Sequence, residues 1–445
     1  MIGNAFSYTK DLWKKDIQMA QDGGVDGFAL NLGSDDWQPA RLDDAYSAAK
    51  ELNSEFKLCI SFDMAVLPGN SASDAATLKQ YITKYAKHPN QLLVDGKVFV
   101  STFSGEKSNF GHPTPQEGWN AEVKQPLEQA GTPVHFVPAL FVAPEAISGD
   151  WSNTVDGLLT WNSAWPTDLT SQSQNVAGVI GALAAPVLDQ VKEAVGSMDA
   201  DTQFIAAVKG TASATADSSA RTYMAGVSPF FFTHYGPDTF NKNWLYVSDD
   251  HLYTSRWSTL IANRDKVDMV EIITWNDYGE SSYIGDIGKD QPKSNAWVDG
   301  FDHTALVPLT KYYTTAFKTG QFPTIEKDSV VLSARPHTKA AQATADGVGK
   351  PLNWELVQDR LWADVLLSGP ATVTLATADG KSQSWDVATA GPGRFSIPLT
   401  VGGFISATVE RDGKTVLTCK PEGYTFTDKP QAYNFNSFVA GCVAE

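Results

Sequence analysis

The sequence predicts a parallel (β/α)8 barrel in residues 1–325, followed by an antiparallel β-sandwich in residues 326–445. Over the first part, short β-rich runs alternate with amphipathic helical stretches, which is typical of a parallel sheet covered by helices. After Thr324 the runs become short and alternating, with turn residues between them, as in an antiparallel sandwich. A chain of 445 residues is long enough for a barrel and one accessory domain.

Eight strands are expected in the first part, one of them at the very start of the chain, from Ile2. The other seven are Asp26–Leu32, Phe56–Asp63, Val98–Thr102, Val134–Leu140, Gly157–Trp161, Gln203–Val208 and Asp268–Thr274. The expected helices are Asp11–Gln21, Arg41–Leu52, Asp74–Ala86, Pro115–Ala130 and Leu309–Phe317. This alternation indicates a barrel with long loops. A doubly wound open sheet is the alternative, but no G-x-G-x-x-G sequence follows the first strand.

The second part shows the alternation of half-buried antiparallel strands. Ala371–Ala376 and Phe404–Glu410 are two such runs. The turn signals between runs are Asp379-Gly380, Gly391-Pro392-Gly393 and Asp412-Gly413. Thr338–Lys350 is rich in Ala and Gly, which predicts a linker or a surface loop.

Composition and charge limit the partners. The formal net charge of −17 repels nucleic acid, so a neutral partner is expected. No apolar run approaches the ~18 residues of a membrane span. No signal-peptide pattern is present, as in a mature or trimmed chain. We expect a monomer that binds neither nucleic acid nor membrane.

Three cysteines permit one disulfide at most. Cys419 and Cys442 lie near the C-terminus, where a bridge would fix the terminal segment. Cys59 lies in an apolar strand, which predicts a buried free thiol. The alternative is that all three cysteines are reduced, because the number of cysteines alone does not show whether the protein resides in an oxidising compartment.

Catalytic side chains of a barrel lie at the carboxyl ends of its strands, and Asp63 occupies such a position. Side chains alternate along a strand, so Cys59, Ser61 and Asp63 share one face. The opposite face carries Leu58, Ile60 and Phe62, which belong under the helices. Asp63 should therefore point into the mouth of the barrel, where a structural carboxylate bonded to a loop is the alternative.

The last parallel strand runs into Trp275-Asn276-Asp277-Tyr278-Gly279-Glu280. Glycoside hydrolysis requires one protonated carboxylic acid and one carboxylate that acts as base or nucleophile. Neighbouring rings and mutual repulsion would raise the pKa of one of the two acids and leave the other ionised. Asp277 and Glu280 fit this chemistry, although a solvated pair in a polar loop has the same spacing.

Further polar and aromatic residues follow strands or lie in the loops beside them. The candidates for substrate binding are Asn31, Glu106, Trp161, His234, Tyr235, Asp249, Trp275, Asn276 and Tyr278. Each also fits a helix cap, a satisfied core group or a solvated loop residue. The seven histidines show no metal-binding spacing, so neither a metal nor a cofactor is expected.

Several motifs in one order resemble glycoside hydrolase family 71, the fungal α-1,3-glucanases or mutanases. They are Gly3-Asn4 followed by Tyr8, Asp26–Asn31, Ser61-Phe62-Asp63, Trp275–Glu280, Ser228–Phe231, Asn243-Trp244 and Ala334–His337. The resemblance is dense over residues 3–320 and thinner beyond. It implies a secreted, metal-independent enzyme of the cell wall that cuts α-1,3-glucan internally.

The resemblance also implies inversion at the anomeric carbon and a role for three acids. Glu280 would be the general acid and Asp277 the general base, while Asp63 would orient the sugar or support the base. A glycosidase of another linkage, a transglycosylase on the same barrel, or a non-catalytic glucan-binding protein are the alternatives. A protein kept only for binding would not need all three acids together.

Overall fold

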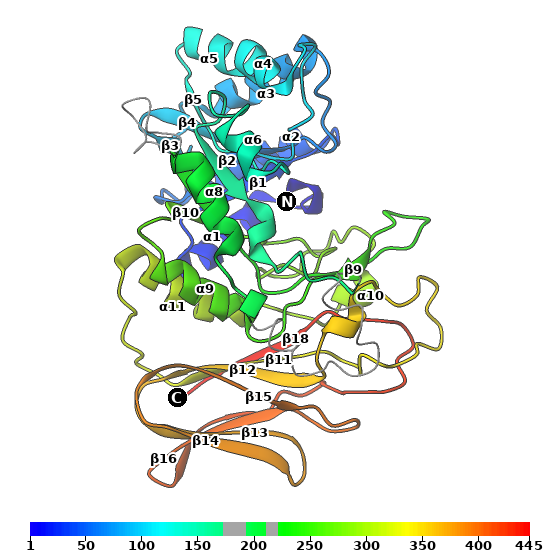
Figure 1. Cartoon of the computed structure of the whole chain (residues 1–445). Coiled ribbons are helices and arrows are strands. Elements are labelled where there is room, and N and C mark those ends of the chain that lie inside the picture. The colour runs from blue at the N-terminus through cyan, green and yellow to red at the C-terminus, as the bar shows by residue number, and fades with distance from the viewer. Residues whose placement is uncertain (172–192, 211–220) are drawn as a thin grey trace.

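The computed structural model describes residues 1–171, 193–210 and 221–445. Figure 1 shows a part made of parallel strands and helices above two antiparallel sheets that hold the C-terminus. In the described residues, none of the helices is both long and apolar enough to cross a membrane.

The upper part is built on parallel strands that follow one another in chain order. They are β1 (Gly27–Leu32), β2 (Lys57–Asp63), β4 (Lys97–Phe103), β5 (Val134–Phe136), β6 (Gly157–Thr160), β7 (Thr222–Val227) and β10 (Met269–Ile272). The ladders run β1-β2-β4-β5 and β6-β7-β10. Hydrogen bonds from Asp156 N to Phe136 O (2.8 Å) and from Leu159 N to Pro138 O (2.9 Å) join the two ladders.

Helices cover the outer face of these strands. They are α1 (Lys10–Asp22), α2 (Gln38–Glu51), α3 (Ala72–Tyr85), α4 (Pro115–Gly118), α5 (Gln125–Gln129), α6 (Pro144–Ser148), α8 (Asp199–Lys209), α9 (Leu252–Ala262) and α11 (Leu306–Thr319). The short helix α10 (Asn295–Val298) lies apart from them, where Trp297 and Val298 pack with Phe232 and Tyr235. A π-helical segment, Trp119–Lys124, joins α4 to α5. In α1 the buried residues are Trp13, Asp16, Ile17 and Ala20, so the expected apolar face is confirmed.

Two of the eight expected strands are wrong. Residues 2–4 form a 3₁₀ helix, in which Gly3 interrupts any alternation. The run expected as Gln203–Val208 lies within α8, whose first turn carries Asp199 and Asp201 at the positive end of the helix dipole. The sequence also misses β7, although Thr222, Tyr223 and Val227 are good strand formers.

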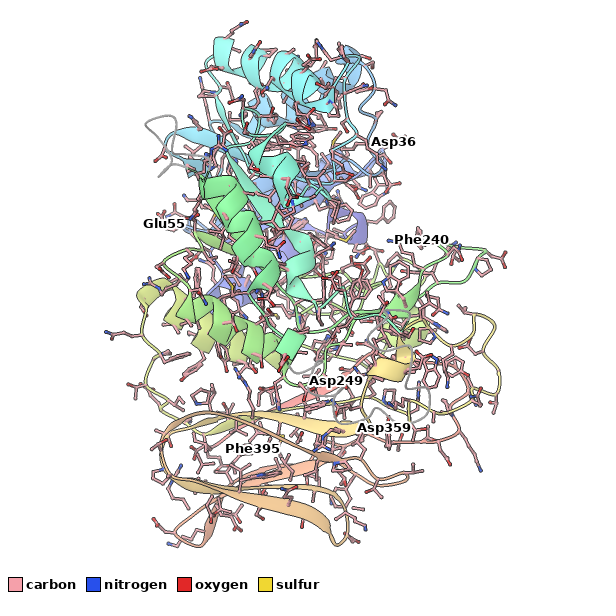
Figure 2. All side chains as sticks on the ribbon, in the orientation of Figure 1. Asp36, Glu55, Phe240, Asp249, Asp359 and Phe395 are labelled. Atoms are coloured by element: carbon pink, nitrogen blue, oxygen red, sulfur yellow. A yellow bond between two sulfur atoms is a disulfide. The ribbon has the colours of Figure 1, made fainter. Side chains whose placement is uncertain are left out.

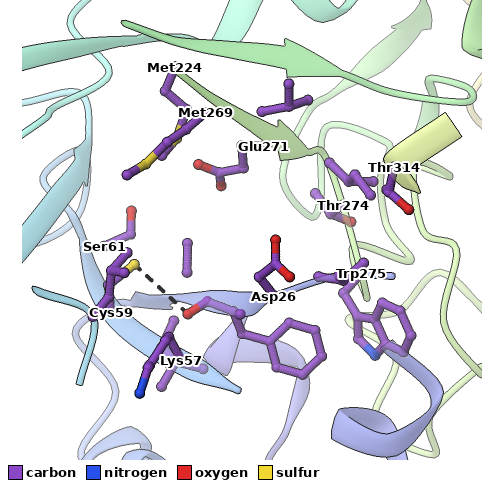
Figure 3. A pocket seen from close by; sticks show the side chains of 18 of the residues that line it. Asp26, Lys57, Cys59, Ser61, Met224, Met269, Glu271, Thr274, Trp275 and Thr314 are labelled. Atoms are coloured by element: carbon purple, nitrogen blue, oxygen red, sulfur yellow. Dashed lines mark hydrogen bonds between the residues drawn. The ribbon is translucent and has the colours of Figure 1, made fainter. Parts of the chain in front are cut away.

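An open seam separates β1 from β10. Both are end strands of their ladders, and no described strand pairs with their outer edges. A cavity of about 440 Å³ lies between them, which we call the seam cavity. Figure 3 shows Cys59, Met224, Met269 and Glu271 around it. The described strands therefore leave the ladder open at this point.

Short antiparallel strands accompany the parallel ones: a hairpin that follows β7 and a two-residue strand at the amino end of β4. Strands β8 (Phe232–His234) and β9 (Asn243–Leu245) form an antiparallel hairpin. The two-residue strand β3 (Leu93–Val94) pairs antiparallel with β4.

The lower part consists of two antiparallel sheets with one shared core. The first has the order β15-β12-β11-β18 and the second β14-β13-β16-β17. Their bounds are β11 (Ser329–Ala334), β12 (Arg360–Leu367), β13 (Ala371–Ala378), β14 (Lys381–Val387), β15 (Gly391–Pro398), β16 (Ser406–Arg411), β17 (Lys414–Cys419) and β18 (Phe438–Val443). Val330, Leu361, Val373 and Val409 from both sheets meet in this core.

The turns of the lower part are largely as predicted. Asp379-Gly380 and Asp412-Gly413 connect paired strands, and Gly380, Asp412 and Gly413 have positive φ. Gly391-Pro392-Gly393 is not a turn, because these residues begin β15 and pair with Val365–Leu367 of β12. Thr338–Lys350 has no regular structure, as expected of a linker or loop.

Buried polar contacts join the two parts. The Asp249 carboxylate, 1% exposed, accepts from Arg335 Nη2 at 2.5 Å and from Gln358 N at 2.5 Å. The Asp364 Oδ1 of β12 accepts from the Thr254 hydroxyl of α9 at 2.7 Å. Figure 2 places Asp249 at the junction between the parts. Such contacts fix one orientation of α9 on the antiparallel sheet.

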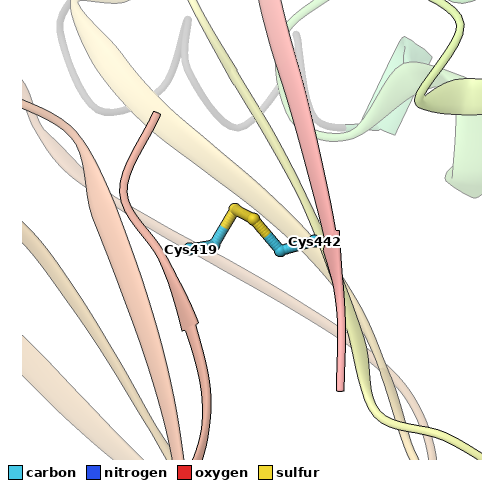
Figure 4. The surroundings of a disulfide bond; sticks show 2 residues. All are labelled: Cys419 and Cys442. Carbon is cyan, nitrogen blue, oxygen red and sulfur yellow. A yellow bond between two sulfur atoms is a disulfide. The ribbon is translucent and has the colours of Figure 1, made fainter. Parts of the chain in front are cut away.

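The expected cysteine pattern is confirmed. Cys419 of β17 and Cys442 of β18 form a disulfide that links the two antiparallel sheets (Figure 4). Their Cα atoms lie 5.5 Å apart, within the usual range for such bonds. Cys59 is a buried free thiol, and burial raises its pKa.

Removal of the disulfide should destabilise the lower part. The bridge closes a loop of 23 residues in sequence separation. Loop-closure entropy therefore predicts a loss of about 3 kcal/mol in the Cys419→Ala/Cys442→Ala double variant. Denaturant unfolding with and without reductant measures it: reductant should lower the midpoint of the wild type and of Cys59→Ala alike, but not that of the double variant. Equal midpoints for wild type and double variant would contradict the prediction.

Candidate active site

Asp63 is the last residue of β2, and the alternation predicted for this strand is observed. Leu58, Ile60 and Phe62 are buried under the helices, whereas Cys59 belongs to the apolar cluster between the strands. Asp63 Oδ1 accepts from Ala65 N at 3.1 Å, which fixes the carboxyl at the strand end. The main chain of β2 thus carries Asp63 to the carboxyl edge of the parallel strands.

Asp277 and Glu280 lie in the loop that follows β10. The Asp277 N–H donates to Thr274 Oγ1 at 2.7 Å, and Asp277 Oδ1 accepts from Glu280 N at 3.2 Å. The Phe232 N–H of β8 donates to the Glu280 carbonyl at 2.9 Å. The loop is therefore held both by its own polar groups and by the β8–β9 hairpin.

The hairpin also supplies a cation. Lys242 Nζ lies 3.4 Å from Glu280 Oε1 and is 46% exposed, while the Glu280 side chain is 19% exposed. At Gly279 a Cβ would lie 2.4 Å from the Tyr235 hydroxyl, so only glycine permits the loop to pack against this ring. The close packing brings Glu280 within reach of Lys242.

Burial and neighbouring charges perturb all three acids. Burial raises the pKa of Glu280, and the negative charge of Asp277 raises it further, while Lys242 opposes this. Burial raises the pKa of Asp277, and backbone N–H groups of the loop oppose the rise. Burial also raises the pKa of Asp63, against the Ala65 N–H and Lys242. Asp63 contributes to the raised pKa of Glu280, so the three carboxyls share one electrostatic environment.

The seam cavity holds several of the sequence-predicted residues. Asn31, Trp161, Trp275 and Asn276 line it. Asn276 is 3% exposed, and its carbonyl accepts from Asn4 Nδ2 at 2.8 Å. Trp275 packs against Phe28, with ring centroids 5.3 Å apart. These contacts give Asn276 and Trp275 structural roles beside the loop that carries the acids.

Four other sequence-predicted residues are buried and have protein partners. His234 is bonded to Asn243 and Asp346, at 2.8 and 2.9 Å. The Tyr235 hydroxyl donates to Pro292 O at 2.7 Å, and the Tyr278 hydroxyl donates to Asp286 O at 2.9 Å. Asp249 belongs to the junction described above. Asp249 and Tyr278 are almost completely buried, at 1% and 0% exposed, so their side chains are not accessible to a substrate.

Sequence reasoning missed the positively charged and aromatic neighbours of the acids. Lys242 precedes Asn243-Trp244, and the pairing of β8 with β9 alone brings it to Glu280. Burial raises the pKa of Tyr246, and the charge of Glu280 adds to this rise. A tyrosine or lysine in a loop has no spacing that signals such a contact, so the sequence offered no means of finding either.

Glu271 is a further buried carboxyl outside this group. It lies in β10 and faces the seam cavity (Figure 3). Burial raises its pKa to about 7. From the sequence, Glu271 inside the last strand is a weaker candidate for substrate contact, with a satisfied core polar group as the alternative.

Comparisons with known proteins agree with the motifs. The model of Glycosyl hydrolase family 71 matches residues 1–445. The chain is 37% identical over 441 residues to the glucan endo-1,3-alpha-glucosidase agn1 of Schizosaccharomyces pombe, covering 99% of this chain and 92% of that protein. It is 33% identical over 444 residues to the mutanase Pc12g07500 of Penicillium rubens, covering 99% of this chain and 86% of that one.

A third relative and a solved structure are more distant. The ascus wall endo-1,3-alpha-glucanase of Schizosaccharomyces pombe is 30% identical, covering 81% of this chain and 75% of that protein. A GH99 endo-alpha-mannosidase from Bacteroides thetaiotaomicron has a TM-score of 0.46 and 13% identity, covering 69% of this chain and 80% of that one. The match of the family model over the whole length decides the assignment: the chain belongs to glycosyl hydrolase family 71 and is a glycoside hydrolase.

Proposed function

We propose that the protein hydrolyses α-1,3-glucosidic bonds within α-1,3-glucan, with inversion at the anomeric carbon. The observation that carries the proposal is the group formed by the buried Asp277 and the half-buried Asp63 and Glu280 beside Lys242. The names of the relatives, a glucan endo-1,3-alpha-glucosidase, a mutanase and an endo-1,3-alpha-glucanase, support the linkage. The net charge of −17 favours a neutral glucan over an anionic polymer.

Glu280 is our general acid. Burial and the neighbouring charge of Asp277 favour its protonated form, which is the form that donates a proton to a leaving oxygen. Asp277 is our general base, because backbone N–H groups of its own loop favour the carboxylate. Asp63 lies at the end of β2, and its negative charge helps to raise the pKa of Glu280. Its role is to orient the sugar or to support the base.

In the proposed step a water molecule attacks the anomeric carbon from the face opposite the leaving sugar. Asp277 takes a proton from this water as the new C–O bond forms. Glu280 gives its proton to the glycosidic oxygen as the old C–O bond breaks, so charge and atoms balance. An inverting site of this kind holds its two carboxyls about 6.5–9.5 Å apart to leave room for the water.

The surrounding architecture supports wider proposals. The parallel strands would form a barrel-type catalytic domain, residues 1–325, that is open at the seam between β1 and β10. Residues 326–445 would form an accessory β-sandwich on one shared core. We propose a secreted monomer that acts at the cell wall, in line with the ascus wall relative.

Neutral substitutions of the three acids test the assignment. Glu280→Gln and Asp277→Asn should each lower the release of reducing sugar from insoluble α-1,3-glucan by about 10²–10⁴-fold, because each removes one proton transfer. Asp63→Asn should lower it by a smaller factor. Proton NMR of the first product anomer tests inversion.

Glu410→Gln is the matched control, since Glu410 is exposed on β16 in the lower part. It should retain wild-type activity. If the wild type binds α-1,3-glucan but releases no sugar from it, nor from α-1,4- or β-linked glucans, the protein is a binding protein and the proposal fails. Release of a product that retains the anomeric configuration would refute inversion alone.

Replacement of Lys242 by Met should shift the pH profile of kcat/KM upward. Lys242 lowers the pKa of Glu280, Asp277 and Asp63, so its loss raises all three. The base then needs a higher pH to ionise, and the acid keeps its proton to a higher pH. The acidic and the basic limb of the pH profile therefore both move to higher pH. Lys87→Met, a change at an exposed lysine after α3, is the control and should leave both limbs in place. Unmoved limbs in Lys242→Met would show that its charge does not reach the acids.

A further inference from the structure

A second hollow lies at the carboxyl ends of β5 and β6. Its volume is about 530 Å³, within the ~300–1,000 Å³ of typical small-molecule sites. We call it the Trp161 pocket. Its walls include Phe141, Trp161, Asn162, Trp165, Asp168 and Gln203.

A row of aromatic rings connects this pocket to Asp63. Phe103 of β4 pairs in register with Asp63 of β2, so the two residues end neighbouring strands. The Phe103 ring centroid lies 5.1 Å from that of Trp161 and 5.2 Å from that of Phe141. Trp161 lines both the seam cavity and the Trp161 pocket. The rings thus form a wall that runs from the strand end of Asp63 into the pocket.

A second row connects the pocket to Glu280. Trp165 packs against Tyr246, with ring centroids 5.6 Å apart. Tyr246 is close enough to Glu280 for the two groups to interact electrostatically. The pocket is therefore linked to the acids on two sides, one through β4 and one through the residues that follow β9.

The chemistry of the pocket matches a sugar chain. Phe141 is 41% exposed and lines the pocket, so its ring is accessible to a ligand there. Asn162, Asp168 and Gln203 are exposed around the rings, and carry both donors and acceptors for hydroxyl groups. Glu106 adjoins Phe141: its carboxylate accepts from the Phe141 N–H at 3.5 Å and from the Ser104 hydroxyl at 3.0 Å. Apolar faces rimmed with neutral and acidic groups suit the flat faces and hydroxyl edges of glucose residues.

We propose that the Trp161 pocket is a glucan-binding subsite that holds sugar units of the substrate chain farther along from the cleaved bond. Trp161 and Phe141 stack against glucose rings, and Asn162, Asp168 and Gln203 bond to hydroxyls. This subsite rests on the proposed function. It adds where the substrate chain lies on one side of the cleaved bond. It predicts that long chains gain affinity from this pocket, whereas the shortest do not.

Binding to a cleavage-deficient parent tests the pocket. In the Glu280→Gln background, α-1,3-linked glucose oligosaccharides of increasing length are titrated by calorimetry. Phe141→Ala and Trp161→Ala should weaken binding of the longer oligosaccharides by about tenfold or more and leave the shortest unchanged. Trp161→Phe should lose less, since it keeps a ring. Phe322→Ala, at a ring that is 46% exposed and packs against Tyr312, is the control and should bind as the parent does.

The outcomes separate the two proposals. Equal affinities of the parent, Phe141→Ala and Trp161→Phe for every length would overturn the subsite while wild-type cleavage of α-1,3-glucan upholds the function. Absence of both wild-type cleavage and parent binding would overturn the function, and the subsite with it. Because Phe141 is exposed, its variant should fold even where Trp161→Ala does not, and thermal unfolding of each variant verifies this.

Discussion

The partial burial of three carboxyl groups around Lys242 is the constraint on which the candidate site depends. An unpaired buried carboxylate is costly, so the protein keeps protons on these groups or offsets their charge. Loop N–H groups bond to Asp277 and Asp63, and Lys242 lies 3.4 Å from Glu280. These contacts do not fully offset burial and the neighbouring charge of Asp277, so the pKa of Glu280 is raised. The same burial that costs stability thus favours the protonated form of Glu280, which is the form that the proposed mechanism uses.

This arrangement depends on a hairpin that the lower part holds in place. Lys242 and Tyr246 flank β9, and the segment 338–353 packs along that hairpin. Asp346 is bonded to His234, and Asn243 Nδ2 donates to Gly349 O at 3.0 Å. Asn353 Nδ2 donates to Leu245 O at 3.0 Å. The segment expected as a linker is therefore a brace that positions the cation opposite Glu280.

Two hollows lie among the parallel strands and at their ends. The seam cavity lies where β1 and β10 leave their edges unpaired, and the Trp161 pocket lies across the ends of β5 and β6. Trp161 lines both. A single residue at the end of β6 thus separates the apolar interior of the strands from the surface on which a chain-like substrate would lie.

The sequence by itself determined the local features: the alternation of β2 that directs Asp63 to the strand end, the apolar face of α1, the Asp379-Gly380 and Asp412-Gly413 turns, and the motifs that identify the family. These depend on residues close together in the chain. The tertiary structure alone decided that residues 203–208 form a helix, that β1 and β10 leave a seam, and that Lys242 meets Glu280. A short apolar run fits helix or strand equally well until its neighbours choose. Contacts between a hairpin and a distant loop arise only when the chain packs, because no local spacing encodes them.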